Sequence, residues 1–180
     1  MRYRRGKRAL CILSIIFLVS CSDSNGADSR IQSVSDEAGI PFGLALPVSH
    51  ASSTVAIGAL MLCRKGPAAS LKIEEVYFQD GGDQIEIASF GTRPAGSTLL
   101  GAEGATSLEA LGFSERTVSQ ACGTGEDWFP TELALLVRAK NTPRASAKTM
   151  QIHYRTSEDL LVTRVPFSLA ICVATAKCEP

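Results

Sequence analysis

The sequence predicts an all-β fold, an antiparallel sandwich of about seven or eight short strands over residues 53–180. Three observations predict it. From residue 53 onward apolar and polar residues alternate with a period of mostly two, which is typical of half-buried strands. Turn signals separate the runs. The chain also has no spacing of the βαβ kind, which parallel sheets need.

Residues 1–20 are expected to be a signal peptide. A basic stretch leads into the apolar run of residues 9–19, which ends at Ser20 and Cys21. Eleven residues are too few for a helix that spans a bilayer, which needs about 20, but they suit the apolar region of a secretory signal. The tetrapeptide Leu18-Val19-Ser20-Cys21 resembles the lipobox of bacterial lipoproteins. That resemblance implies that Cys21 is diacylated, becomes the mature N-terminus and holds the protein outside the cytoplasm.

Residues 21–52 are expected to be the lipidated cysteine and a flexible linker. Residues 22–40 are rich in Ser, Asp, Gly and Asn, and such a segment buries too little apolar surface to offset its ordering entropy. Within the later part, Phe42, Leu44, Leu46 and Val48 alternate, which is consistent with a first short strand.

The middle of the chain predicts strands that are interrupted by bulges. Residues 55–63 are apolar on both faces, so that strand is expected to be covered on both sides. The apolar phase changes across Glu74 and Glu75, and again between Ile87 and Phe90, which predicts a β-bulge at each place. Asp80-Gly81-Gly82-Asp83 is typical of a hairpin turn, because glycine supplies positive φ. Residues 107–111, ended by Gly112, predict about one helical turn.

Leu133, Leu135 and Val137 predict a further strand, and residues 150–154 another, with Met150, Ile152 and Tyr154 facing inward. A turn over residues 156–159 leads to the last strand, residues 161–173, whose apolar face is unbroken. Pro166 lacks an amide donor and predicts an edge position, a bulge or a change of sheet. This strand pattern resembles the immunoglobulin-like domains of small secreted bacterial proteins. The resemblance implies binding or scaffolding more than catalysis.

Four cysteines remain for the mature domain after Cys11 leaves with the signal and Cys21 is acylated. An even number in an oxidising compartment predicts two disulfides. Strand phase favours Cys172–Cys178 as a local surface bridge, which leaves Cys63–Cys122 as a longer bridge through the sandwich. The alternative, Cys63–Cys172 with Cys122–Cys178, stays open. A zinc site is disfavoured, because the chain has no Cys-x-x-Cys pair.

Charge and motifs disfavour nucleic-acid binding and catalysis. Five of the 18 basic residues precede residue 9, so their removal leaves 13 basic residues against 18 acidic ones, a net charge of −5. Phosphate binding needs a basic patch instead. Neither His50 nor His153 has a catalytic partner at a fixed spacing, and Asp80 and Asp83 are more typical of a turn than of a calcium site. No catalytic, cofactor or metal residue is therefore predicted.

Asp127-Trp128-Phe129-Pro130 holds the sole tryptophan. Trp128 and Phe129 either cap the end of the core or form a binding loop, since aromatic residues on loops are typical interface anchors. The expected function is that of a lipid-anchored envelope or cell-surface protein, a binding or structural module without catalysis. Its expected partners are the membrane, through the diacylglyceryl anchor at Cys21, and an envelope protein or polymer. The alternative is an extracytoplasmic enzyme or metal-binding protein whose site assembles from distant positions.

Overall fold

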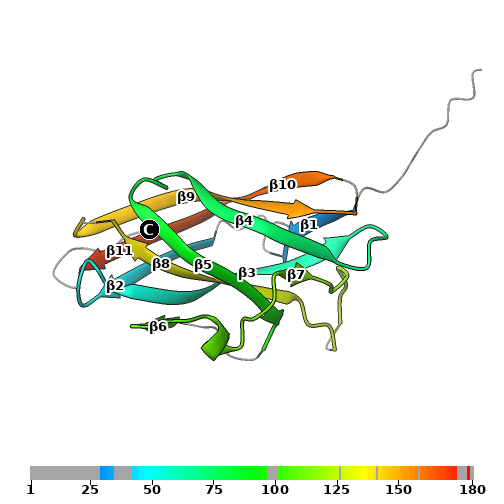
Figure 1. Ribbon diagram of the computed structural model, residues 1–180, viewed down its shortest axis with the longest axis horizontal. Helices are drawn as coiled ribbons and strands as arrows, with labels where there is room; N and C mark the ends of the chain where they lie inside the picture. The colour runs from blue at the N-terminus through cyan, green and yellow to red at the C-terminus, as the bar shows by residue number, and fades with distance from the viewer. Residues whose placement is uncertain are drawn as a thin grey trace, which may run out of the picture.

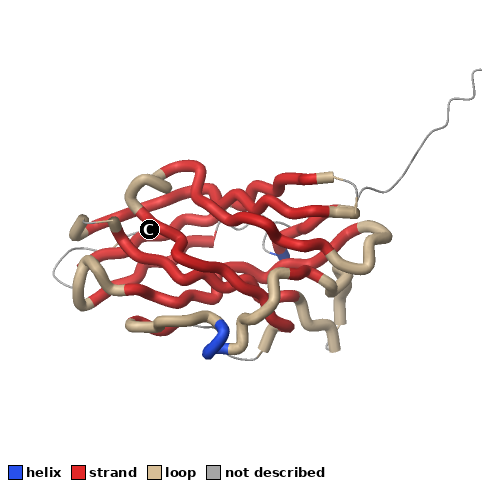
Figure 2. Tube along the Cα trace, in the orientation of Figure 1, coloured by secondary structure: helices blue, strands red, loops and turns tan. Residues whose placement is uncertain are grey.

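The folded part of the chain consists of two β-sheets packed face to face. The computed structural model describes residues 29–34, 42–96, 101–125, 127–140, 142–157, 159–173 and 178. Figure 1 shows the strands running along the long axis, and Figure 2 shows the loops gathered mainly at the two ends. The described residues form eleven strands and a 3₁₀ turn: β1 (Arg30–Ser33), β2 (Phe42–Val48), β3 (Thr54–Lys65), β4 (Leu71–Asp80), β5 (Ile85–Pro94), β6 (Gly101–Glu103), η1 (Glu109–Leu111), β7 (Thr117–Val118), β8 (Thr131–Ala139), β9 (Arg144–Arg155), β10 (Leu160–Val165) and β11 (Phe167–Val173).

The all-β prediction is confirmed, but seven or eight strands are too few and the sheets are not purely antiparallel. The five-stranded sheet has the order β1–β3–β8–β5, with β6 also pairing with β3. The six-stranded sheet has the order β2–β11–β9–β4–β7, with β10 also pairing with β9. β2 and β11 are parallel, from Phe42↔Phe167 to Val48↔Val173. A parallel pair needs a long connection, so local alternation in the sequence does not reveal it.

Two strands lie within residues 21–52, which the sequence analysis expects to be linker. β2 is the short strand that alternation indicates there, and β1 pairs with β3 from Arg30↔Lys65 to Ser33↔Leu62. The boundary at residue 53 is therefore too late. β1 has a single large apolar residue, Ile31, which is 2% exposed. Such a strand forms because it pairs with a neighbour, and its sequence shows too little alternation of apolar and polar residues to predict it.

The core between the sheets is built from the inward faces that the sequence predicts. Phe78 of β4 and Phe167 of β11 stack there with ring centroids 6.2 Å apart. Other buried members from β8 and β9 are Leu133, Leu135, Val137, Met150, Ile152 and Tyr154. Burying side chains of this size stabilises the fold by about 1.5–3 kcal/mol each.

Both predicted bulges are confirmed. The pairing of β4 with β9 shifts between Ile73 and Glu75, and that of β5 with β8 shifts between Ile87 and Ser89. A third shift lies in β3 between Gly58 and Leu60. There the inward phase passes from Val55 and Ile57 to Leu60 and Leu62, which explains why β3 looks apolar on both faces.

Pro166 divides the predicted last strand into β10 and β11. Both pair with β9, but β10 ends at Val165↔Met150 and β11 resumes at Leu169↔Ala147. Between these two pairs, residues 166–168 therefore lie opposite residues 148–149 of β9. One strand thus has one residue more than its partner, as in a bulge. Thr149 of β9 has a φ of 56° at this place.

The turn at Asp80-Gly81-Gly82-Asp83 is correctly predicted as a turn but not as a hairpin. Gly81 has a φ of 81°, and its carbonyl accepts a hydrogen bond from the Gln84 amide at 2.9 Å. The flanking strands β4 and β5 belong to different sheets. Turn chemistry is local, so it does not report which sheet the next strand joins.

The five-stranded sheet carries a second, smaller apolar cluster on its outer face. Leu108 and Phe113 pack there on Ala56, Ala134 and Leu136. The predicted helical turn is η1, and Gly112 ends it with a φ of 86°. Within the described ranges, no helix is both long and apolar enough to cross a membrane.

Candidate functional site

Residues 113–122, which we call the bridging segment, join the two sheets along one side. The Thr92 amide of β5 donates a hydrogen bond to the Glu115 carbonyl at 2.8 Å. The Ile73 amide of β4 donates to the Arg116 carbonyl at 2.7 Å. One short stretch therefore satisfies backbone groups from both sheets, which limits how far they can separate.

A disulfide fixes the end of the bridging segment to β3. Cys63 and Cys122 are bonded with their Cα atoms 4.9 Å apart. Beside them the Arg64 amide donates to the Gln120 carbonyl at 2.8 Å, and the Cys122 amide donates to the Arg64 carbonyl at 2.9 Å. The pairing favoured by strand phase is confirmed for these two cysteines. The expected path through the sandwich is wrong, because Cys63 lies outside the core cluster that contains Leu62 and Cys122 lies alongside β3.

Residues 123–130, which we call the aromatic loop, begin at this disulfide. The Trp128 indole Nε1–H donates to the Ala121 carbonyl at 2.8 Å. A Cβ at Gly123 would lie 3.1 Å from the Trp128 ring, so glycine lets the ring lie close to the loop backbone. Phe129 is 58% exposed. Trp128 thus packs on its own loop, and neither aromatic residue belongs to the buried core clusters.

The second predicted disulfide, Cys172–Cys178, is also present, with a Cα–Cα distance of 5.6 Å. Its expected place at the surface is wrong at one end, because Cys172 is 1% exposed. Cys172 lies in β11, which has β2 on one side and β9 on the other. Side chains of a strand that has a neighbour on each side are less exposed to solvent than those of an edge strand.

A polar network covers the outer face of β4 and β9. The Tyr77 hydroxyl lies 3.0 Å from His153 Nε2 and donates to Gln151 Oε1 at 2.8 Å. Gln151 Nε2 in turn donates to Gln79 Oε1 at 2.7 Å. The carboxylate of Glu75 lies 3.9 Å from His153 Nδ1. His153 is therefore half-buried and has polar partners on the outer face of the sheet.

This network is better suited to holding two strands together than to catalysis. A hydroxyl has one proton, and Tyr77 gives it to Gln151 Oε1, which can only accept. The Tyr77 proton is therefore engaged with Gln151, and the hydrogen bonds among Tyr77, Gln151 and Gln79 tie β4 to β9.

A buried ion pair lies on the outer face of the five-stranded sheet. Arg93 of β5 contacts the fully buried Glu132 of β8, with Nη2 and Oε2 2.8 Å apart. The guanidinium also lies 4.1 Å from the Phe113 ring centroid and donates to the Leu111 carbonyl. Among the described atoms, Glu132 Oε1 has no hydrogen-bond partner. Sequence reasoning missed the pair, because the register of β5 on β8 brings these two residues together.

The remaining candidates stay separate. His50 lies in a turn, where its amide donates to the Ser53 hydroxyl. Asp80 and Asp83 are exposed, and the described residues hold no group of three or more potential metal ligands. All four cysteines that zinc would need are in disulfides. Cys21 and the signal segment lie outside the described residues.

No protein-family model, curated protein or solved structure matches this chain. Function must therefore be argued from the residues of the chain itself. Of the sites described above, the aromatic loop combines a base held by a disulfide and a hydrogen bond with an exposed aromatic side chain.

Proposed function

We propose that the protein is a lipid-anchored protein of the bacterial cell envelope whose sandwich is a binding module without catalytic activity. The tetrapeptide Leu18-Val19-Ser20-Cys21 supports the anchor, with Cys21 as the acylated N-terminus. Two acyl chains on one residue hold a protein stably at a membrane, whereas one chain gives marginal binding. The net charge of −5 after removal of the signal is consistent with a partner other than nucleic acid.

The strand order supports an immunoglobulin-like architecture for the sandwich. In that architecture, strands A, B, E and D form one sheet and strands C, F and G the other. The sheet A, B, E, D corresponds to β1, β3, β8 and β5. The sheet C, F, G corresponds to β4, β9 and the consecutive strands β10 and β11, and the order along the chain is the same. Fold alone does not assign function, so the binding role needs a site.

The observation that carries the binding role is the exposure of Phe129 on a loop with a fixed base. The Cys63–Cys122 disulfide holds the residue just before the aromatic loop, and the hydrogen bond from Trp128 ties the loop back to Ala121. Covering the side chain of Phe129, which is 58% exposed, would contribute favourable free energy to binding through burial of its apolar surface. Because these contacts hold the base of the loop, binding there has less ordering entropy to overcome than binding to a loop without them.

Two experiments test the two parts of this proposal. Mass spectrometry of the native protein is expected to find a mature chain that begins at an acylated Cys21, and an unmodified cysteine or an uncleaved leader contradicts the anchor. For binding, a photoreactive phenylalanine at position 129 is expected to crosslink in intact envelopes. The same group at Ser52, an exposed residue in the turn before β3, is the control. Equal or absent crosslinking at both positions contradicts the binding role.

A further inference from the structure

One end of the sandwich gathers the point where the described chain begins and three loops. We call it the entry end; it comprises Ser29, the loop of residues 66–70, and the described residues of two further loops, 123–125 with 127–130 and 156–157 with 159. The Ser29 hydroxyl accepts a hydrogen bond from the Ala68 amide at 2.8 Å. A Cβ at Gly66 would lie 2.6 Å from Ser29 Cα. The chain therefore enters the body in direct contact with the first of these loops.

The aromatic loop belongs to the same end. Arg64, two residues before Gly66, shares backbone hydrogen bonds with Gln120 and Cys122, and Trp128 bonds to Ala121. Figure 1 shows the start of β1, the β3–β4 loop and the segment before β8 together at one end of the body. Phe129 is thus carried close to the place where the chain enters.

Exposed hydrophobic side chains concentrate at the entry end. Among the described residues, the exposed large hydrophobic side chains are Phe129 at 58%, Leu160 at 53% and Val162 at 48%. Phe129 lies in the aromatic loop, and Leu160 opens β10 opposite Arg155, directly after the 156–159 turn. Val162 lies two residues further, on the sheet face beside His153.

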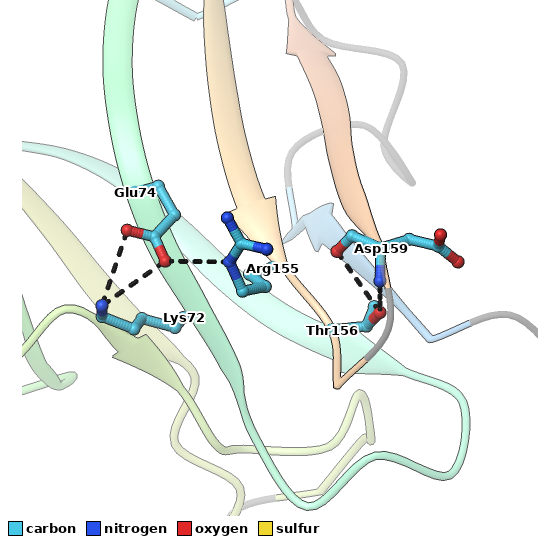
Figure 3. A network of polar contacts seen from close by, with 5 residues as sticks. All are labelled: Lys72, Glu74, Arg155, Thr156 and Asp159. Carbon is cyan, nitrogen blue, oxygen red and sulfur yellow. Dashed lines mark hydrogen bonds and ion pairs between the residues drawn. The ribbon is translucent and has the colours of Figure 1, made fainter.

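One acidic group at this end, Glu74, is paired with two basic side chains. The Glu74 carboxylate lies 3.4 Å from Lys72 Nζ and 3.4 Å from Arg155 Nε (Figure 3). Desolvation opposes the shift, yet hydrogen bonds and positive charge from Lys72 and Arg155 lower the pKa of Glu74. The 66–70 loop, Gly-Pro-Ala-Ala-Ser, carries no charge. Asp127 and Asp159, which stand just before Phe129 and Leu160 in the chain, are exposed carboxylates, so they can stay hydrated at the level of the headgroups and need not be desolvated.

The chain outside the structure limits how far this end can be from the anchor. Eight residue steps separate Cys21 from Ser29. Even fully extended, eight residues span at most about 29 Å. An acylated Cys21 therefore keeps Ser29 within about 29 Å of the membrane surface, so the entry end is the part of the body that can reach the headgroups most readily.

We infer that the entry end lies against the membrane that holds the anchor, with the side chains of Phe129 and Leu160 in the lipid interface. This inference rests on the proposed acylation of Cys21 and names the lipid surface as the occupant of the aromatic loop. Aromatic and leucine side chains are typical of segments that insert at the headgroup boundary. A short tether raises the effective concentration of these side chains at the membrane surface.

The sole tryptophan, Trp128, makes the test possible in the native protein. The acylated full-length mature protein, with Cys21 modification verified by mass spectrometry, is reconstituted into phosphatidylcholine vesicles that contain lipids with a nitroxide on the headgroup. Trp128 fluorescence is expected to be lower than in vesicles without nitroxide. The double variant Phe129→Ser/Leu160→Ser is expected to lose most of this quenching.

The matched control moves the tryptophan to the opposite end, in the double variant Trp128→Phe/Ser52→Trp, whose fluorescence is expected to stay unquenched. If Cys21 carries no lipid, the proposed anchor fails and this inference fails with it. If Cys21 is acylated but Trp128 is quenched no more than the tryptophan of the control variant, the inference alone is overturned. If Trp128 is covered in native envelopes but not in lipid vesicles, the inference is also overturned, and a protein partner takes the place of the lipid.

Discussion

Arg93 and Glu132 form an ion pair, 2.8 Å between Nη2 and Oε2, in which the carboxylate side chain is 0% exposed and the guanidinium side chain 26% exposed. The two residues lie opposite each other on β5 and β8, on the same outer face as the small apolar cluster. The carboxylate depends on this one cation, since Glu132 Oε1 has no partner among the described atoms.

We expect Arg93→Met to destabilise the domain by about 3–5 kcal/mol, because it leaves a buried carboxylate without its partner. The double variant Arg93→Met/Glu132→Leu should recover most of that loss, since it removes both charges. Urea unfolding monitored by Trp128 fluorescence measures both. Arg138→Met removes one partner of the exposed pair with Glu86 and should cost about 0–1 kcal/mol. An equal loss for Arg93→Met and Arg138→Met contradicts the prediction.

The two disulfides should contribute unequally to stability. Cys63–Cys122 closes a separation of 59 residues and Cys172–Cys178 one of 6. Loop-closure entropy in the unfolded chain then predicts losses of about 4 kcal/mol for Cys63→Ser/Cys122→Ser and about 2 kcal/mol for Cys172→Ser/Cys178→Ser. Guanidinium unfolding of the two double variants tests the order, and the reverse order refutes the argument from loop length.

Gly91 should be required for the bridging segment to lie close to β5. A Cβ there would lie 2.5 Å from the Phe113 carbonyl oxygen, and a backbone atom cannot move aside as a long side chain can. We expect Gly91→Ala to destabilise the domain by about 1–3 kcal/mol through overpacking. Gly96→Ala has open space around the new Cβ and should change stability by less than about 0.5 kcal/mol. Thermal melts of both variants make the comparison, and similar melting temperatures would count against close packing at Gly91.

Glu103 should make stability sensitive to acid. The Ser49 amide donates to Glu103 Oε1 at 2.7 Å, and this bond, with others from the Ser53 and Ser49 side chains and the charge of His50, lowers the pKa of Glu103 from 4.5. A carboxyl group whose pKa is lowered by folding stabilises the fold above its unfolded pKa. That contribution is lost as the pH falls through the lower, folded value. Melting temperatures of wild type and Glu103→Gln should therefore differ at pH 6 and converge on acidification below about pH 4.5. A constant difference across this range would show that ionisation of Glu103 is not involved.

Sequence reasoning located what depends on local chemistry. The phase changes around Glu74 and Ile87 marked real bulges, and Pro166 marked the division of the last strand, because each feature follows from the side chains at that place. Strand phase also favoured the correct cysteine partners, although it placed Cys172 at the surface, where a neighbouring strand on each side covers it.

What sequence reasoning missed depends on contacts between distant segments. β1 forms because β3 offers it an edge, and β2 lies parallel to β11 at the other end of the chain. The Arg93–Glu132 pair and the Tyr77–His153 contact require cross-strand register, which no single strand contains. Phe129 was selected because it stands in a loop beside the sole tryptophan, whereas the exposure of Leu160 follows from the twist and edges of a completed sheet.

The parallel pairing of β2 with β11 has a mechanical consequence. Seven aligned residue pairs join the two strands, and in a parallel pair the N-terminal end of one strand and the C-terminal end of the other point in opposite directions. Tension between the start of β2 and the end of β11 therefore loads the paired residues in shear, so that they share the force. This pair of strands should resist stretching along its length better than peeling from one end.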